Sequence, residues 1–447
     1  MSVAQTVSPA LETTPRSKRL RGIAILIIAA LAISCGSQLI GELHIPLGSV
    51  EITILPMVWA ILLGGLVSAQ KIKPFSVTLQ NSANSLVSVA VLLVMASLSF
   101  SIGPNLGIVV SAGPALLLQE VGHLIGTLVL ALPLALILGM GPATIGATFS
   151  IDREGSFAMV SERYGSDSAE YRGVLSMYIF GTVFGAVVIS LLVSIVTSLH
   201  WFNPQALAMG AGVGSGSMMG AATAVIAEEY PALADQVKAL AATSNVITTL
   251  LGVYVGFFVA LPLAHKIYHW ATRNKDSWIA KINDKGDSIK EGVQLDTSKV
   301  TDKGQSLLGQ WSSVAIVMCL GIPVAWITDG KVSWESVACY AIFAALIYFG
   351  MLLHKFTKIP ALLTVVTLGV LLTSPWSPVS GFITAVSGHV LFTSICTIML
   401  SLAGLSLGKD LGMLKQISWK IIPVGLVAIL SSYIFSVCVA EFVLGYW

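Results

Sequence analysis

The sequence is poor in charge. Only 10% of its 447 residues are Asp, Glu, Lys or Arg, whereas 55% are hydrophobic. Soluble domains carry about 25% charged residues, so this scarcity excludes an ordinary soluble domain. The chain is predicted to be an all-α polytopic membrane protein in contact with the lipid bilayer. A net charge of +2 gives no reason to expect a nucleic-acid partner.

Cysteines are also few, and they show neither paired spacing nor metal-ligand spacing. The five are Cys35, Cys319, Cys339, Cys396 and Cys438, all in apolar segments. Glu120 and His123 share one helix face, but a carboxylate-bundle metal site needs several such helices, so no metal is predicted. His-Glu-x-x-His motifs, Walker loops and nucleotide or haem fingerprints are absent. We therefore expect neither an enzyme nor a cofactor, apart from Na⁺ or H⁺ as a coupling ion.

Long apolar runs are what the chain has in abundance. Runs of roughly 17 to 25 residues predict regular membrane spans. Two further apolar stretches, 140–165 and 204–230, are interrupted by Gly, Pro and charge, and are predicted to be broken or re-entrant helices. The regular spans are expected at 22–41, 52–69, 85–103, 113–139, 172–198, 236–263, 311–329, 334–353, 359–375, 387–407 and 419–443.

Basic residues predict the orientation. The tail 1–21 contains Arg16, Lys18, Arg19 and Arg21 and should be cytoplasmic. Counting forward places the charged linker 266–308 inside and the C-terminus outside, in a bacterial inner membrane. The linker has a composition that cannot build a core. It separates a first membrane part, 22–265, from a second, 309–447.

An internal repeat is visible in the sequence. Ile54–Gly65 resembles Lys358–Gly369, and Ser101–Gly107 resembles Ser406–Gly412 at nearly the same offset. The predicted orientation makes the two copies inverted, which is typical of secondary transporters.

A weaker match joins Ala158–Gly165 to Ala224–Pro231, although chance could also produce it. As a true repeat, it would make the two irregular stretches enter from opposite sides and meet near the midplane.

The second irregular stretch holds the main site candidates. Its glycines would let backbone amides approach a ligand, its hydroxyls lie at short reach, and a helix beginning near Ser217 would direct its N–H groups at an anion. Close helix packing by small residues is the alternative. The predicted substrate-binding residues here are Gly212, Gly214, Ser215, Gly216, Ser217, Met218, Met219 and Thr223.

The following span adds uncharged polar groups. Ser244 and Thr248 share a helix face, with Asn245 beside them. We predict Ser244 and Asn245 as substrate ligands, and Asn245 and Thr248 as ion ligands. Interhelical hydrogen bonds are the alternative reading.

The first irregular stretch carries charge at membrane depth, which is costly unless paired or hydrated. Asp152 and Glu154 are predicted to bind the coupling ion, and Ser156 and Met159 to line the substrate site. A surface turn with exposed charges is the alternative.

Parts of the chain resemble known families. Gly141–Asp167 resembles the repeat of the AbrB-like membrane proteins. Gly214–Leu263 is similar to the sodium/glutamate symporters and lysine exporters. Taken whole, the chain resembles an uncharacterised bacterial integral-membrane family, domain of unknown function 3100.

The resemblance implies the fold of cation/proton antiporters and anion transporters, with inverted repeats, a scaffold and a mobile core with broken helices. It also implies a small carboxylate or amino acid as substrate, with Na⁺ or H⁺. Gly216–Met219 departs from the Gly-His-Gly-Thr of the glutamate symporters, and its methionines favour a less polar substrate than glutamate.

Three functions follow as hypotheses. The first is a secondary active transporter of a small organic anion or amino acid, coupled to Na⁺ or H⁺ by alternating access, in a possible homodimer. The others are a passive, holin-like channel and a non-transporting membrane scaffold. The inverted repeat favours the first.

Overall fold

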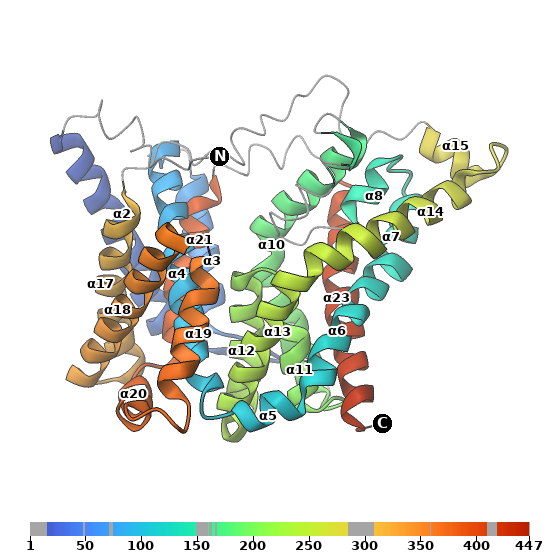
Figure 1. The fold of residues 1–447 in the computed structure, drawn as a ribbon. Coiled ribbons are helices and arrows are strands. Elements are labelled where there is room, and N and C mark those ends of the chain that lie inside the picture. The colour runs from blue at the N-terminus through green and yellow to red at the C-terminus, as the bar shows by residue number, and fades with distance from the viewer. Residues whose placement is uncertain are drawn as a thin grey trace. The chain divides into compact units, whose positions relative to one another are not determined.

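The computed structural model describes residues 16–47, 50–70, 75–148, 160, 163–165, 168–284, 308–357, 359–408 and 418–446, most of them in helices (Figure 1). The chain forms two compact units, and each combines segments distant in sequence. Unit 1 comprises 1–44, 54–104 and 295–411, and unit 2 comprises 45–53, 105–294 and 412–447. This grouping differs from the two sequence-based membrane parts, because the last helix packs with residues 105–294.

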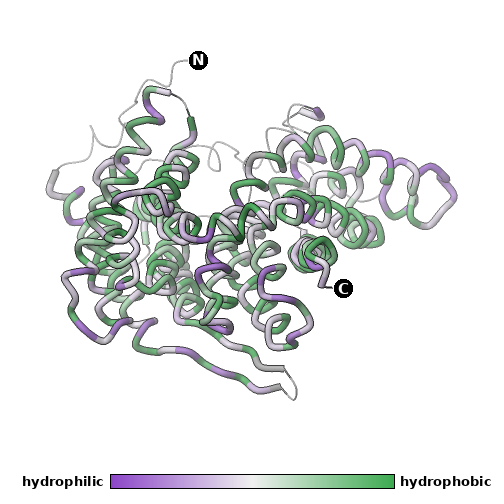
Figure 2. The backbone as a smooth tube through the Cα atoms, turned by 60° about the horizontal axis from the view of Figure 1, so that its bottom comes forward, coloured by the Kyte–Doolittle hydropathy of each residue, from purple (hydrophilic) through white to green (hydrophobic). Residues whose placement is uncertain are grey.

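Several helices are suited to a bilayer. Among the described residues, seven are long and apolar enough to cross a membrane, or eight if a pair bent by 65° at 388–391 is one span. The tube in Figure 2 is coloured hydrophobic along most helices. All-α polytopic architecture is thus confirmed in outline. The regular spans predicted at 52–69 and 359–375 contain helices of only 14 and 13 residues, and 387–407 is part of the bent pair.

Unit 1 is a helical bundle. α3 packs against α21, and α19 packs against α4; α2 lies beside α3, as α18 lies beside α19. Its helices are α2 (Arg16–Ile40), α3 (Pro56–Ala69), α4 (Val77–Ile102), α17 (Gln310–Asp329), α18 (Trp334–Thr357), α19 (Ala361–Thr373), α20 (Ser380–Ser387) and α21 (Phe392–Ser406).

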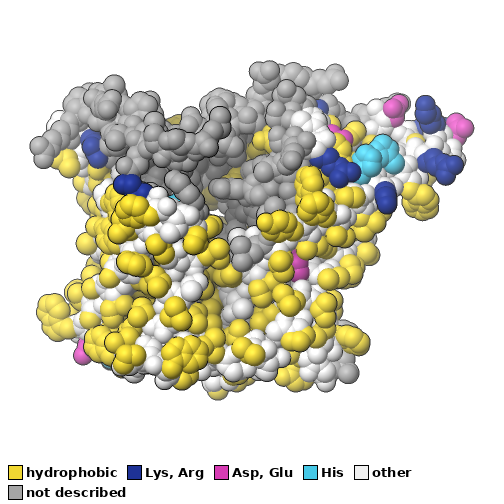
Figure 3. All heavy atoms as spheres, viewed as in Figure 1, with side chains coloured by type: hydrophobic (Ala, Val, Ile, Leu, Met, Phe, Trp, Pro, Cys, Tyr) yellow, Lys and Arg dark blue, Asp and Glu magenta, His cyan; other side chains and the backbone are white. Residues whose placement is uncertain are grey.

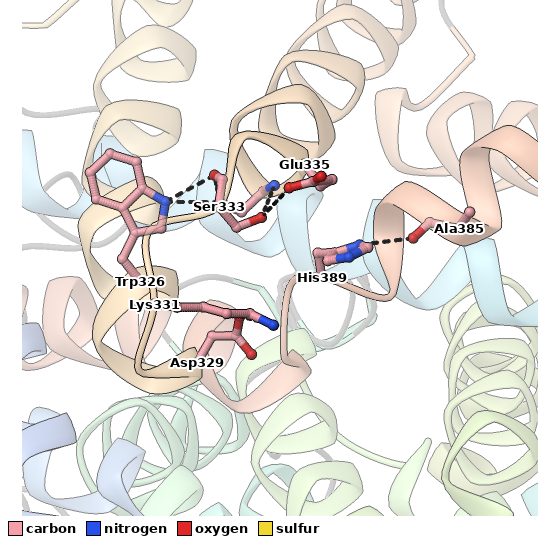
Figure 4. A network of polar contacts seen from close by, with 8 residues as sticks. Trp326, Asp329, Lys331, Ser333, Glu335, Ala385 and His389 are labelled. Atoms are coloured by element: carbon pink, nitrogen blue, oxygen red, sulfur yellow. Dashed lines mark hydrogen bonds and ion pairs between the residues drawn. The ribbon is translucent and has the colours of Figure 1, made fainter.

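The corner between α17 and α18 is fixed by a polar network (Figure 4). Gly330 ends α17 with φ +69°, a conformation suited to glycine. The indole Nε1 of Trp326 donates to the Ser333 carbonyl and to Ser336 Oγ, at 3.1 and 2.9 Å. Ser333 Oγ in turn donates to Glu335 and accepts the Ser336 amide. These bonds tie the end of α17 to the start of α18.

Unit 2 contains the interrupted segments. α6, η1 and α7 form one apolar run, α10 is its longest helix, and α11 and α12 are separated by a short break. Its elements are α5 (Leu106–Ser111), α6 (Gly113–Gly126), η1 (Thr127–Ala131), α7 (Leu132–Ile137), α8 (Ala143–Ala147), α10 (Ala169–Ser198), α11 (Pro204–Ala211), α12 (Gly216–Glu229), η2 (Pro231–Leu233), α13 (Ala234–Val255), η3 (Gly256–Ala260), α14 (Leu261–Thr272), α15 (Trp278–Asp284) and α23 (Ile421–Leu444).

Two helical runs of unit 2 share an unexpected signature. η1 and η3 are both π-turns, and each is followed by Leu-Pro-Leu-Ala, at Leu132–Ala135 and Leu261–Ala264. Proline has no amide hydrogen and crowds the preceding turn, and a π-turn is one way a helix accommodates such a local disturbance. The two runs therefore deform in the same way at the same motif.

A strand pair corrects the purely helical prediction. β1 (Leu43–Leu47) and β2 (Val50–Ile54) form a two-stranded sheet where the span 52–69 was expected to begin. Ile52, Thr53 and Ile54 are β-branched and favour extended backbone. The Thr53 amide donates to Ser194 Oγ of α10 at 2.7 Å.

The linker predicted at 266–308 is not solvated throughout. α14 continues to Thr272, and α15 packs on α7. Asn283 is buried, donates to the Leu136 carbonyl and accepts the Gly141 amide at 3.0 Å. The charged side chains between 266 and 284 are exposed, and Figure 3 shows Lys, Arg, His and acidic groups gathered over α14 and α15.

Candidate functional site

The helix break predicted within 204–230 is present between α11 and α12. α11 ends at Ala211, and α12 begins at Gly216. Gly214 has φ +116°, a conformation that other residues adopt only with strain. Ser215 caps α12, because its Oγ accepts the Met218 amide at 3.3 Å. The main chain therefore leaves helical geometry at 212–215.

α13 holds the non-helical backbone in place. The side-chain amide of Asn245 donates to the carbonyls of Gly212 and Gly214, at 2.8 and 3.1 Å. Ser244 Oγ donates to the Met209 carbonyl at 2.7 Å. Both side chains are buried. These bonds satisfy carbonyls that the break removes from the helix, as a non-aqueous environment requires.

The candidate residues around the break differ in burial: some are partly accessible, and the others are packed against neighbouring helices. Ser215, Gly216 and Ser217 are half-buried, and the two hydroxyls lie 3.0 Å apart. Gly212 leaves no space for a side chain, because an added Cβ would overlap Ser244. The part of the break open to a ligand is thus confined to 215–217.

The larger candidate side chains of α12 are packed. Met218 packs against Gly185 of α10. A Cβ added to Gly185 would come 2.8 Å from the Met218 sulfur. Met219 and Thr223 are fully buried, and Thr223 Oγ donates to the Met219 carbonyl at 2.7 Å. In this conformation these three residues position α12, and ligand contact by them stays a prediction.

Thr248 extends the polar face of α13 toward α6. Its hydroxyl donates to the Ser244 carbonyl at 2.9 Å and accepts from Gln119 Nε2 at 3.3 Å. Gln119 and Glu120 are buried, with Glu120 only 3% exposed. Asp152, Glu154, Ser156 and Met159, the candidates of the first irregular stretch, lie outside the described residues.

Gln119 and Glu120 were missed as site residues by sequence reasoning, which considered Glu120 only as a metal ligand. A signal was available in the repeated Leu-Pro-Leu-Ala motif. Gln119 and Thr248 precede Leu132 and Leu261 by the same number of residues. The hydrogen bond between them therefore joins equivalent positions of α6 and α13.

The second buried acid of unit 2 has a structural role. Glu441 of α23 is 4% exposed, and its carboxylate accepts the Asn203 amide at 3.0 and 3.2 Å. The positive end of the α11 dipole stabilises a carboxylate at this position. It anchors the start of the broken helix.

These contacts define what the site can do chemically. The first N–H groups of α12 lie outside the intrahelical hydrogen-bond ladder, beside two half-buried hydroxyls. Such a helix start can hold a carboxylate or another anion. From the break, the polar face of α13 continues through Ser244 and Asn245 to Thr248, which bonds Gln119, the neighbour of Glu120 in sequence.

Residues 35–270, more than half of the chain, match the family described as protein of unknown function (DUF3100). This span includes β1, α3, α4, the broken helix and all the predicted substrate and ion ligands, whereas Glu441 lies outside it. No curated protein and no solved structure matches the chain.

Proposed function

The chain belongs to the DUF3100 family, and for this membrane protein we propose secondary active transport of a small organic anion or amino acid, coupled to Na⁺ or H⁺. The protein acts by alternating access in a bacterial inner membrane and is not an enzyme. Its substrate is a small molecule that presents an anionic group to the start of α12.

One observation carries the proposal: the α11–α12 segment is interrupted within the apolar protein, and α13 fixes the interruption with buried side-chain bonds. Irregular backbone at membrane depth is tolerated where it is buried in protein or lines a cavity. Transporters use such half-helices to bind substrates near the midplane. Packing alone needs small residues on one helix face and does not require a half-buried turn with two hydroxyls at Ser215 and Ser217.

The inverted repeat draws support from unit 1. In the sequence, α3 corresponds to α19, and the end of α4 corresponds to the end of α21. Exchanging the copies converts the α3–α21 contact into the α19–α4 contact, and both contacts occur. A two-fold relation between repeats is the arrangement that gives alternating access in known transporter folds.

The residue roles follow from position. Ser215, Gly216 and Ser217 bind the anionic group of the substrate, Gly214 supplies the turn that precedes them, and Ser244 and Asn245 hold the binding loop in shape. Thr248 lies on the path to the coupling ion, and Asp152, Glu154, Ser156 and Met159 remain predicted ligands from the first irregular stretch.

Reconstituted protein tests the proposal. Liposomes with imposed H⁺ or Na⁺ gradients are screened for uptake of radiolabelled small carboxylates and amino acids. Saturable accumulation that collapses with an ionophore is expected. Non-saturating flux would identify a channel, and the absence of flux and of any ligand-induced thermal shift would identify a scaffold; either result contradicts the proposal.

A variant pair locates the substrate site. Ser217→Ala removes a half-buried hydroxyl whose side-chain contact is Ser215 Oγ, so substrate affinity is expected to fall about 10- to 150-fold, the loss of one hydrogen bond to a charged group. Thr243→Val on α13 is the matched control, because the Thr243 hydroxyl donates only to Ala239 within its own helix. Equal affinities in the two variants would place the substrate elsewhere.

A further inference from the structure

We propose that Glu120 carries the coupling proton of this transporter. The inference rests on the proposed function and identifies both the ion and the residue that binds it. A proton from one side of the membrane binds the Glu120 carboxylate, and the same proton leaves to the other side after the conformational change.

Glu120 lies inside a membrane helix. It belongs to α6, within the candidate span Gly113–Ile137, and is 3% exposed. Ionisable residues in such segments are costly to bury and mark ion pathways and proton relays. Glu441, by contrast, caps α11 near the end of α23 and has an evident structural role.

The immediate surroundings of Glu120 are close and polar. On α13, Gly252 leaves room for the carboxylate, because an added Cβ would come 3.1 Å from Glu120 Oε1. On α6, Gln119 is fully buried, and its Oε1 has no hydrogen-bond partner among the described residues. A buried acceptor without a partner costs free energy, so this part of α6 carries a buried polar group that the fold leaves incompletely satisfied.

The position of Glu120 couples it to the binding loop. Ser244, Asn245, Thr248 and Gly252 follow one face of α13. At one end of this face Asn245 holds the Gly212 and Gly214 carbonyls, and at the other the Glu120 carboxylate lies beside Gly252, close to where a side chain on that residue would begin. A change in the charge of Glu120 therefore acts on the helix that shapes the loop.

Other titratable groups occur on Glu120's own helix and on the helices packed against it. They are His123 on α6, Asp235, Lys238 and Tyr254 on α13, and Tyr433, Cys438 and Glu441 on α23. Asp235 and Lys238 form their own ion pair at 2.8 Å at the start of α13. α5 and α11 have no titratable side chain.

A proton fits this position better than Na⁺. α6 is regular around Glu120 and keeps its backbone carbonyls within the helix, and the Thr248 hydroxyl is already used twice. Few oxygens are thus left to surround a metal ion, whereas a proton needs a single carboxylate oxygen. Protonation also removes the charge that makes burial costly.

Infrared difference spectroscopy tests the proton assignment without a substrate. Purified protein is compared between high and low pH, and the band of a protonated carboxyl group is followed. We expect a band that titrates in the wild type, is lost in Glu120→Gln, and is unchanged in Glu228→Gln, which removes an exposed carboxyl instead. An unchanged band in Glu120→Gln overturns the proposal.

A second measurement separates this proposal from the transport function itself. In liposomes, Glu120→Gln should lose proton-driven accumulation at least 10-fold while retaining substrate exchange without a gradient. Retained proton-driven accumulation overturns the role of Glu120 and leaves the transport function standing. The melting temperature of the protein is also compared in NaCl and in choline chloride. If NaCl raises the melting temperature of the wild type but not of Glu120→Gln, then Glu120 binds Na⁺ and the proton assignment is wrong.

Discussion

At the scale of single residues, Asn245 contributes most to the shape of the candidate site. Asn245→Ala removes the side-chain amide that donates to the buried carbonyls of Gly212 and Gly214. We expect a loss of about 1–3 kcal/mol in the free energy of unfolding, measured by denaturation in detergent. Thr243→Val should change stability by less than about 0.5 kcal/mol. Equal stability of the two variants would show that Asn245 does not hold the break.

His265 predicts a pH dependence at the end of α14, beyond the predicted span 236–263. Burial lowers its pKa below the usual value of 6.5, and neighbouring His269 and Arg163 lower the pKa further, while Glu170 raises it. Tyr164 Oη lies 2.9 Å from His265 Nδ1, and the His265 and His269 rings are 4.2 Å apart. Protonation of His265 would add a positive charge to this cluster.

The sign follows from linkage. A lowered pKa means that the folded protein binds the proton less tightly than the unfolded chain, so the neutral contact stabilises the fold above about pH 6.5. The contribution is lost as pH falls through the lowered pKa. Melting temperatures measured from about pH 8 to about pH 5 should fall less in His265→Gln than in the wild type. An identical pH profile in both proteins would contradict the prediction.

At the scale of elements, unit 1 depends on close helix contact. Gly64 of α3 and Gly404 of α21 face each other with their Cα atoms nearly touching, because an added Cβ on either would come 2.9 Å from the Cα of the other. Gly64→Ala should destabilise the protein by about 1–3 kcal/mol through overpacking. Gly65→Ala is the matched control, since its Cβ would meet only Leu407 at 3.6 Å. Equal melting temperatures of the two variants would show that α3 and α21 can move apart at little cost.

At the scale of the whole molecule, the predicted membrane orientation can be tested by chemical labelling of introduced cysteines. Lys275 lies in the segment expected inside, and Lys331 in a loop expected outside. In a background free of the native cysteines, Lys331→Cys should react with a membrane-impermeant maleimide in intact cells. Lys275→Cys should react only after permeabilisation, because its segment carries the cytoplasmic excess of basic residues. The reverse pattern would invert the orientation.

The sequence by itself determined the membrane class, most of the helical positions and a break within 204–230, because hydropathy and glycine act locally along the chain. It also suggested the copies α3 and α19, since repeats preserve local patterns. Only the tertiary structure decided which residues meet. Asn245 bonding to Gly212, Thr248 meeting Gln119, and Glu120 filling the space beside Gly252 all join helices distant in sequence, and no local pattern encodes the packing that brings them together.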